Sequence, residues 1–290
     1  MSLNIVVLAK QVPDTRNVGK DAMKEDGTIN RSALPAIFNP EDLNALEQAL
    51  QIKDAHPGST ITVLTMGPQR AAEILRESLY RGADKGIVLS DRVFAGSDTL
   101  ATSYALATAV RHIGKVDILL GGRQAIDGDT AQVGPQVAEK LNLPQVTYAE
   151  SVKVDNGVAT ITRRLENGVE TVQCPLPLVV TVNGSADACR PRNARLVQKF
   201  KYAALPSEKD ALSEPVKARV EARDYLQLLE WNAAEVGANA EETGLSGSPT
   251  KVKGIVNVVF TAKESKQIDG ANDAELEELI VDLIANHTIG

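Results

Sequence analysis

Aromatic residues are scarce in this chain, and basic residues are fewer than acidic ones. Only 3% of its 290 residues are aromatic, and there is a single tryptophan. Few rings are therefore available to stack on the bases of a nucleic acid. Acidic residues outnumber basic ones by 38 to 31, and the net charge of −7 disfavours general binding to nucleic acids or anionic membranes. We therefore expect no nucleic-acid partner.

The chain also has few residues that ligate metals or act as nucleophiles. Its two cysteines, Cys174 and Cys189, fit neither a metal-ligand spacing nor a disulfide framework. Each is better explained as a small apolar filler than as a reactive thiol. The three histidines, His56, His112 and His287, are scattered and form no triad. The sequence thus predicts no metal site and no hydrolytic centre.

Long hydrophobic runs are missing as well. No apolar run reaches the roughly 18 residues of a membrane span, and the N-terminus lacks the pattern of a signal peptide. The hydrophobic content of 43% and the charged content of 24% are typical of a globular protein. We expect a cytoplasmic protein without a membrane span.

Apolar runs and helical patterns alternate through the first half of the chain. The apolar runs predict strands over 4–9, 59–65, 85–89 and 116–120. Helices are expected after the start signal at 39–42, over 71–82 and over 97–112. This alternation is typical of an α/β fold in which helices cover both faces of a parallel sheet.

The period of the pattern changes after residue 146. Strand patterns over 147–154 and 158–165, with turn signals at 155–157 and 167–168, predict an inserted β-meander. The run 178–182 is expected to return to the parallel sheet. We therefore predict an α/β domain over 1–202 and an irregular C-terminal arm over 203–290.

The predicted arm carries two helix signals. A short one lies around 225–231, and a second, over 274–286, follows a polar, linker-like run at 244–250. The second helix places Leu276, Leu279, Ile280 and Leu283 on one apolar stripe. An amphipathic helix beyond a linker needs a surface to cover, and we expect that surface to belong to another subunit.

A basic segment precedes the arm. Its cations are Arg190, Arg192, Arg195, Lys199 and Lys201. A solvated basic face is the simplest interpretation. On an acidic protein, a clustered positive segment is also typical of a partner-contact loop.

The most informative segment is the glycine-bearing stretch at 121–135. It follows a predicted strand and precedes a predicted helix, the position at which open α/β sheets bind ligands. Asp129 or Thr130 is expected to cap this helix, whose free N–H groups and positive dipole end suit a phosphate. The stretch therefore predicts a nucleotide site.

Several side chains of this stretch would support such a site. Gly121, Gly122 and Gly128 let the backbone approach an anion closely. Arg123 suits either a charged fork to phosphate or stacking on an aromatic ring. The alternative interpretation is a tight strand-to-helix connection without a ligand, because the spacing matches neither a Walker loop nor a GxGxxG turn.

Three further loops follow or precede elements at the same edge of the predicted sheet. They span 10–15, 66–68 and 96–102. Each is explained individually as a turn or a cap. Because the carboxyl ends of parallel strands share one edge, these loops are also able to line one crevice.

These motifs together resemble the beta (small) subunit of electron transfer flavoproteins, over nearly the whole chain. The resemblance is carried by residues 10–15, 39–40, 66–68, 81–84, 98–103, 122–135, 164–168 and 177–181. It implies an α/β fold of the adenine nucleotide hydrolase type. It also implies a heterodimer in which an alpha subunit carries an exchange-active FAD.

The resemblance further implies that the beta subunit holds a nucleotide of its own. Ordinary members hold AMP as a structural ligand, whereas members that bifurcate electrons hold a second FAD, which accepts hydride from NADH. Residues 12–14, 98–103, 127–132 and 247–250 are similar to the bifurcating group. FAD is therefore expected here, with AMP as the alternative, in a carrier that uses no catalytic side chain.

The family pattern assigns contacts within that site. The adenosine would lie against Leu8, Ala9, Asn39 and Met66, the phosphate against backbone groups of 122–133, and the isoalloxazine near Thr99, Thr102 and Arg123. The expected contact residues are Leu8, Ala9, Asn39, Pro40, Glu41, Asp42, Met66, Asp98, Thr99, Thr102, Gly122, Arg123, Gln124, Ala125, Ile126, Asp127, Gly128, Asp129, Thr130, Ala131, Gln132 and Val133.

The implied partners are an alpha subunit and an acyl-CoA dehydrogenase or a related dehydrogenase, with NADH and ferredoxin in a bifurcating member. One departure from the family concerns the partner-recognition segment, which usually opens Pro-Arg-Tyr-Ala. Here Asn193 replaces the tyrosine, and Leu196 is the candidate for the apolar anchor. The identity of the dehydrogenase therefore stays open.

Overall fold

The computed structural model describes residues 1–14, 35–251, 265 and 267–289. Its contacts divide the chain into two compact units, Met1–Lys253 and Gly254–Gly290. Residues 203–253 thus belong by contact to the first unit. The division at 202/203 into a domain and an arm remains a prediction.

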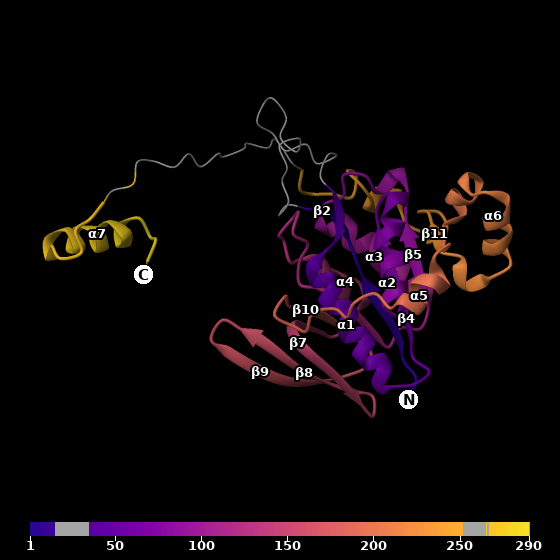
Figure 1. Ribbon diagram of the computed structural model, residues 1–290, viewed down its shortest axis with the longest axis horizontal. Coiled ribbons are helices and arrows are strands. Elements are labelled where there is room, and N and C mark those ends of the chain that lie inside the picture. The colour runs from indigo at the N-terminus through magenta and orange to yellow at the C-terminus, as the bar shows by residue number, and fades with distance from the viewer. Residues whose placement is uncertain (15–34, 252–264, 266, 290) are drawn as a thin grey trace. The chain divides into compact units, whose positions relative to one another are not determined.

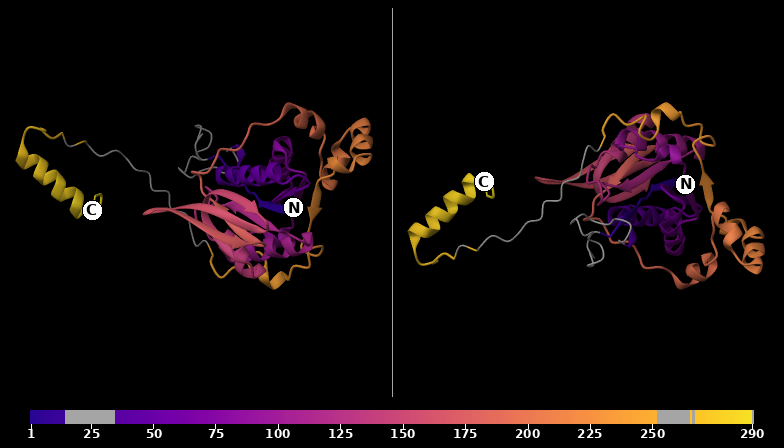
Figure 2. Two further views of the ribbon diagram at one scale, coloured as in Figure 1. Left: turned by 90° about the horizontal axis from the view of Figure 1, so that it is seen from below. Right: turned by 90° about the horizontal axis from the view of Figure 1, so that it is seen from above.

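The first unit is built on a nine-stranded mixed sheet that is mostly parallel (Figures 1 and 2). In spatial order its strands are β11 (Leu229–Trp231), β5 (Lys85–Leu89), β4 (Thr60–Met66), β1 (Asn4–Leu8), β6 (Ile118–Gly122), β10 (Leu178–Val182), β7 (Gln145–Asp155), β8 (Val158–Leu165) and β9 (Gly168–Pro175). The strands from β11 to β7 run parallel, and β8 and β9 are antiparallel additions. The predicted α/β fold is confirmed.

Helices cover both faces of this sheet. The main ones are α1 (Pro40–Ala55), α2 (Ala72–Arg81), α3 (Thr99–Ile113) and α4 (Val133–Leu141). Because successive strand residues point to opposite faces, Ile5 and Val7 of β1 share a core with α1 and α2, while Val6 and Leu8 share a second core with α3 and α4. Each buried side chain of this size contributes about 1.5–3 kcal/mol.

The meander is confirmed: β7 is longer than predicted, and β8 has the predicted bounds. β7, β8 and β9 pair in sequence, and the β7–β8 turn has left-handed φ at Asn156 and Gly157. The run 178–182 forms β10, which lies between β6 and β7, as expected. The meander therefore extends the sheet at one edge, beyond the strands that carry the predicted site.

Smaller elements complete the first unit. They are β2 (Gln11–Pro13), β3 (Ala36–Phe38), α5 (Ala194–Phe200), α6 (Glu214–Glu221), and the 3₁₀ turns η2 (Gln69–Ala71), η3 (Arg92–Phe94), η4 (Pro206–Ala211), η5 (Asp224–Leu226) and η6 (Ala240–Glu242). The prediction of a helix around 225–231 is wrong. That stretch forms η5 and then β11, because the free edge of β5 offers a parallel partner at 87–89.

The described part of the second unit contains α7 (Asp273–Ala285), which begins one residue before the predicted start. Asn272 caps it by accepting a hydrogen bond from the N–H of Ala274. Leu276, Leu279 and Leu283 are half-buried, and Ile280 is exposed. Within the described residues, no helix is both long enough and apolar enough to cross a membrane.

Candidate functional site

The loop of residues 123–132, here called the β6–α4 loop, lies at the carboxyl ends of the parallel strands. β1, β4 and β6 are adjacent and parallel, so their ends at Leu8, Met66 and Gly122 share one edge of the sheet. Leu8 and Ala9 are buried there, and Met66 is half-buried. Three of the four expected adenosine contacts, Leu8, Ala9 and Met66, therefore form an apolar floor beside the loop.

Asn39 holds the middle of the β6–α4 loop. This fully buried residue precedes α1, and its Nδ2 donates to the carbonyl of Gln124 (2.9 Å). Its Oδ1 accepts from the backbone N–H of Ile126 (3.1 Å). Pro40 follows at the first turn of α1, where its missing N–H costs no helical hydrogen bond. The start of α1 thus fixes the shape of the loop.

Glu41 binds the same loop from the first turn of α1. Its Oε2 accepts from the N–H of Gln124 (2.9 Å), and its Oε1 accepts from Nη2 of Arg123 (3.0 Å). The guanidinium of Arg123 also lies 5.9 Å from the centroid of the Tyr148 ring. Arg123 therefore has an anionic partner and an aromatic neighbour within the protein.

Tyr148 was not among the predicted contacts. It has a left-handed φ of 60° in β7, next to shifts in the strand register. Such a bulge redirects a side chain, and here it brings the ring toward Arg123. Nothing in the local sequence singles this residue out, because the alternation of a strand gives no sign of where a bulge falls.

Asp42 joins the ends of β1 and β6. Its Oδ1 accepts from the N–H of Gly122 (3.0 Å), and its Oδ2 accepts from the N–H of Lys10 (2.8 Å). Burial raises the pKa of the Asp42 carboxyl to about 7, although these hydrogen bonds and the charge of Lys10 act in the opposite direction. The group therefore titrates near neutral pH in the folded protein.

A pH effect on stability follows from this raised pKa. Between about pH 4 and 7 the folded protein keeps a proton that the unfolded chain has lost. Because the folded state binds more protons, the free energy of unfolding should fall as the pH rises, by at most about 1.4 kcal/mol per pH unit. Urea unfolding of the wild type and of Asp42→Asn at several pH values tests this. The wild-type curve should fall relative to the variant and become parallel above about pH 7; curves that are parallel throughout would contradict it.

The glycines of the loop differ in what they do. A Cβ on Gly122 would lie 2.5 Å from Oδ1 of Asp42 and 2.8 Å from its backbone nitrogen. Gly122 is therefore required by the packing of β6 against α1. A Cβ on Gly128 would have no atom of the described residues within 4 Å, so their packing does not require that glycine.

Two carboxylates on the outer part of the loop are engaged by neighbours. Nζ of Lys10 donates to both carboxylate oxygens of Asp127, at 2.7 and 2.8 Å. Nε2 of Gln124 donates to Oδ1 of Asp129 (2.8 Å). Lys10 partly offsets the repulsion that Asp127 would exert on a bound phosphate.

The helix after the loop begins later than predicted. α4 begins at Val133, so the expectation that Asp129 or Thr130 caps it is wrong. Asp129 and Ala131 have left-handed φ values of 48° and 52°, which do not fit a helix start, and the Asp129 carboxylate binds Gln124 instead. Among the described residues, nothing accepts a hydrogen bond from the backbone N–H groups of residues 130–132. These groups are available to a ligand.

α3 meets the loop from the opposite side. Oγ1 of Thr99 donates to Oε1 of Gln132 (3.0 Å) and accepts from Nε2 of Gln136 (3.4 Å). Asp98 caps α3 by accepting from the N–H groups of Leu100 and Ala101. Asp98 and Thr99 thus have definite structural partners, and Thr102 follows within the first turn of α3.

The basic segment is only partly solvated. Arg190 pairs with Glu47 and Asp54 (both 2.8 Å), which makes it a structural residue. Asn193, the departure from the family pattern, caps α5 by accepting from the N–H groups of Arg195 and Leu196. Leu196 is half-buried against the core, beside a cavity of about 590 Å³.

Sequence comparisons identify the class of protein to which this sheet and loop belong. The family model "Electron transfer flavoprotein domain" matches residues 26–212. The caffeyl-CoA reductase-Etf complex subunit CarD of Acetobacterium woodii is 42% identical over 250 residues, which cover 86% of each chain. The electron transfer flavoprotein subunit beta of Clostridium acetobutylicum is 42% identical over 251 residues, which cover 87% of this chain and 86% of that one.

A further relative matches from end to end. The acryloyl-CoA reductase electron transfer subunit gamma of Anaerotignum propionicum is 38% identical over 292 residues, covering 99% of this chain and 100% of the relative. The chain therefore belongs to the electron transfer flavoprotein family, among the beta subunits. The resemblance seen in the motifs is confirmed.

Proposed function

We propose that this chain is the nucleotide-holding beta subunit of a heterodimeric electron transfer flavoprotein, and that its site takes FAD, with AMP as the alternative. In this role it passes electrons from NADH or an acyl-CoA dehydrogenase to acceptors, with ferredoxin among them if the protein bifurcates electrons. We place it in the cytoplasm. The names of the relatives, which include subunits of reductase complexes, support work in a complex.

The β6–α4 loop carries this proposal. Its inner side is held by Asn39 and Glu41, while the N–H groups of residues 130–132 have no described acceptor. A row of free backbone donors before a helix N-terminus suits a phosphate, and the start of α4 adds a favourable dipole. The apolar floor at Leu8 and Ala9 suits an adenine ring. The residues present therefore fit an adenine nucleotide.

FAD, when bound, would supply the hydride and electron chemistry. The residues of the chain would bind and orient it, and none needs to act as an acid or base. The predicted role of Arg123 toward the isoalloxazine has to include Glu41, because the two side chains form an ion pair. Arg123 without Glu41 would be an uncompensated positive charge, and Glu41 without Arg123 would be an uncompensated negative charge beside the flavin.

Counting the nucleotides tests the proposal. We expect the purified heterodimer to release two FAD molecules on acid denaturation, one from each subunit. One flavin with stoichiometric AMP would contradict the assignment of FAD and leave a structural nucleotide binder. Release of neither a second FAD nor AMP would contradict the nucleotide site itself.

Arg123→Ala tests the electrostatic part. The variant should accept hydride from NADH roughly tenfold more slowly, equivalent to ~1.4 kcal/mol, because Glu41 would then oppose added negative charge on the flavin. The double variant Glu41→Gln/Arg123→Ala should recover part of the rate, since glutamine still accepts from the N–H of Gln124 but carries no charge. Rapid-reaction absorbance with NADH measures both rates. An unchanged rate in the single variant would contradict the role of Arg123.

A further inference from the structure

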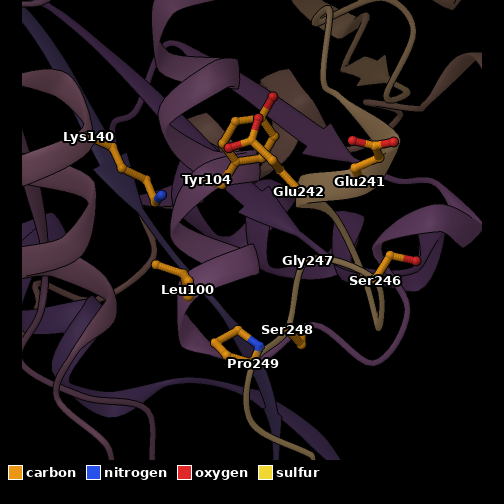
Figure 3. Close-up of a pocket in the computed structure, with 9 residues that line it drawn as sticks. All are labelled: Leu100, Tyr104, Lys140, Glu241, Glu242, Ser246, Gly247, Ser248 and Pro249. Carbon is orange, nitrogen blue, oxygen red and sulfur yellow. The ribbon is translucent and has the colours of Figure 1, made fainter.

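The chain returns to the start of α3 shortly before its second unit. Residues 243–250, here called the strap, pack tightly on residues 93–98. A Cβ on Gly244 would lie 2.1 Å from the carbonyl oxygen of Val93, and a Cβ on Gly96 would lie 2.7 Å from Leu245. Ser248 and Pro249 of the strap lie beside Leu100 of α3, where they line a cavity of about 340 Å³ (Figure 3).

Hydrogen bonds fasten the strap to the residue that caps α3. The N–H of Asp98 donates to Oγ of Ser248 (2.8 Å), which in turn donates to the carbonyl of Gly244 (2.6 Å). Oδ2 of Asp98 accepts from both the N–H (3.0 Å) and Oγ1 (2.7 Å) of Thr250. Ser248 is buried, with 4% of its surface exposed. Ser248 is thus shielded from solvent within this contact.

The Asp98 carboxylate bridges two parts of the molecule. Its Oδ1 accepts from the first turn of α3, and its Oδ2 accepts from Thr250. Partial burial favours the neutral acid, but the hydrogen bonds from Thr250, Ala101 and Leu100 outweigh this and lower the pKa of the carboxyl below its ordinary value. A carboxylate that accepts this many hydrogen bonds has little freedom to rotate.

The position of α3 matters for the β6–α4 loop. Thr99 is the first residue of α3, and its hydroxyl donates to Gln132 at the end of that loop. A shift of the helix start would therefore break the contact between Thr99 and Gln132. Gln132 directly follows the free N–H groups of residues 130 and 131.

We propose that Ser248 and Thr250 are positioning residues: through Asp98 they fix the start of α3, and through Thr99 they fix the β6–α4 loop for its nucleotide. The inference rests on the proposed nucleotide site. In this proposal Ser248 and Thr250 hold the helix that supports the loop.

Thr250→Val in the full chain tests the inference. Valine keeps the shape and the backbone N–H but removes the hydroxyl donor. We expect the variant to bind FAD and AMP about 3- to 10-fold more weakly, in line with the net contribution of one ordinary hydrogen bond, because the bond from Thr250 to Asp98 is exposed to solvent. Amide hydrogen exchange should become faster over residues 123–132 and stay unchanged in β1 and β4. Thr250→Ser restores the donor and should bind within twofold of the wild type, roughly the scatter of a surface change.

Thr171→Val is the matched control, because Thr171 is an exposed threonine in β9, the strand at the edge of the sheet. It should leave binding and exchange unchanged. If Thr250→Val does not fold, Ser248→Ala provides the same two measurements. The inference would be overturned if the wild type binds nucleotide and the Thr250→Val variant has the same affinity and the same amide hydrogen exchange in the β6–α4 loop. If the wild type binds neither nucleotide, the proposed function fails, and the exchange data alone decide whether the strap holds the loop.

Discussion

Gly122→Ala is expected to lower the free energy of unfolding by about 3 kcal/mol, the upper part of the usual range for an overpacked core. The added methyl group would overlap Oδ1 and the backbone nitrogen of Asp42, and also the backbone carbon of Glu41, at 2.8 Å. Backbone atoms at a helix start cannot move aside without breaking the contacts that α1 makes with the loop. Urea unfolding at neutral pH measures the loss.

Gly128→Ala is the control within the same loop. Its methyl group would meet no atom of the residues that the structure describes, so stability should change by less than about 1 kcal/mol. If the two variants were equally stable, the close approach of β6 to α1 would not be a constraint on the fold.

Asn39→Ala is expected to weaken nucleotide binding more than tenfold and to cost about 2–3 kcal/mol of stability, because it leaves the carbonyl of Gln124 and the N–H of Ile126 without their partner. Loss of these bonds frees the middle of the loop, so that the free N–H groups nearby no longer converge. Isothermal calorimetry with AMP and FAD measures the affinity, and urea unfolding measures the stability.

Asn44→Ala is the matched control for Asn39→Ala. Asn44 lies in α1, five residues after Asn39, and its amide also donates two hydrogen bonds, to the carbonyls of Ala186 and Asp187 (both 2.9 Å). It should lose comparable stability and keep its nucleotide affinity. Equal losses of affinity in the two variants would show that the effect of Asn39 is general destabilisation.

The sheet could be predicted from the sequence because its signals are local. Apolar runs and glycine-containing turns lie within a few residues of each other, and they predicted the order of strands and helices, the meander and the return of 178–182 to the sheet. β11 could not be predicted, because three residues form a strand there only when the edge of β5 is in place.

The site was harder to predict for the same reason. Asn39, Glu41 and Asp42 were expected contacts, but the sequence does not reveal that they bind backbone groups 80 or more residues away. The predicted start of α4 was wrong. Asp129 has a side chain that commonly caps helices, but in this loop its carboxylate accepts a hydrogen bond from Gln124 instead. Capping propensity reflects the type of side chain and not a competing partner elsewhere in the loop.

The spacing of these contacts along the chain also sets an order of events during synthesis. The polypeptide emerges from its N-terminus, so the side chains at the start of α1 precede their loop partners by 80 or more positions. Asp98 forms its hydrogen bonds with Thr250 only after Thr250, 152 positions later in the chain, has been synthesised. A ribosome-bound chain that stops before the strap can assemble most of the sheet but cannot make this last contact. Full nucleotide affinity would therefore mark a chain whose first unit is complete, and free nucleotide would favour finished molecules over truncated ones.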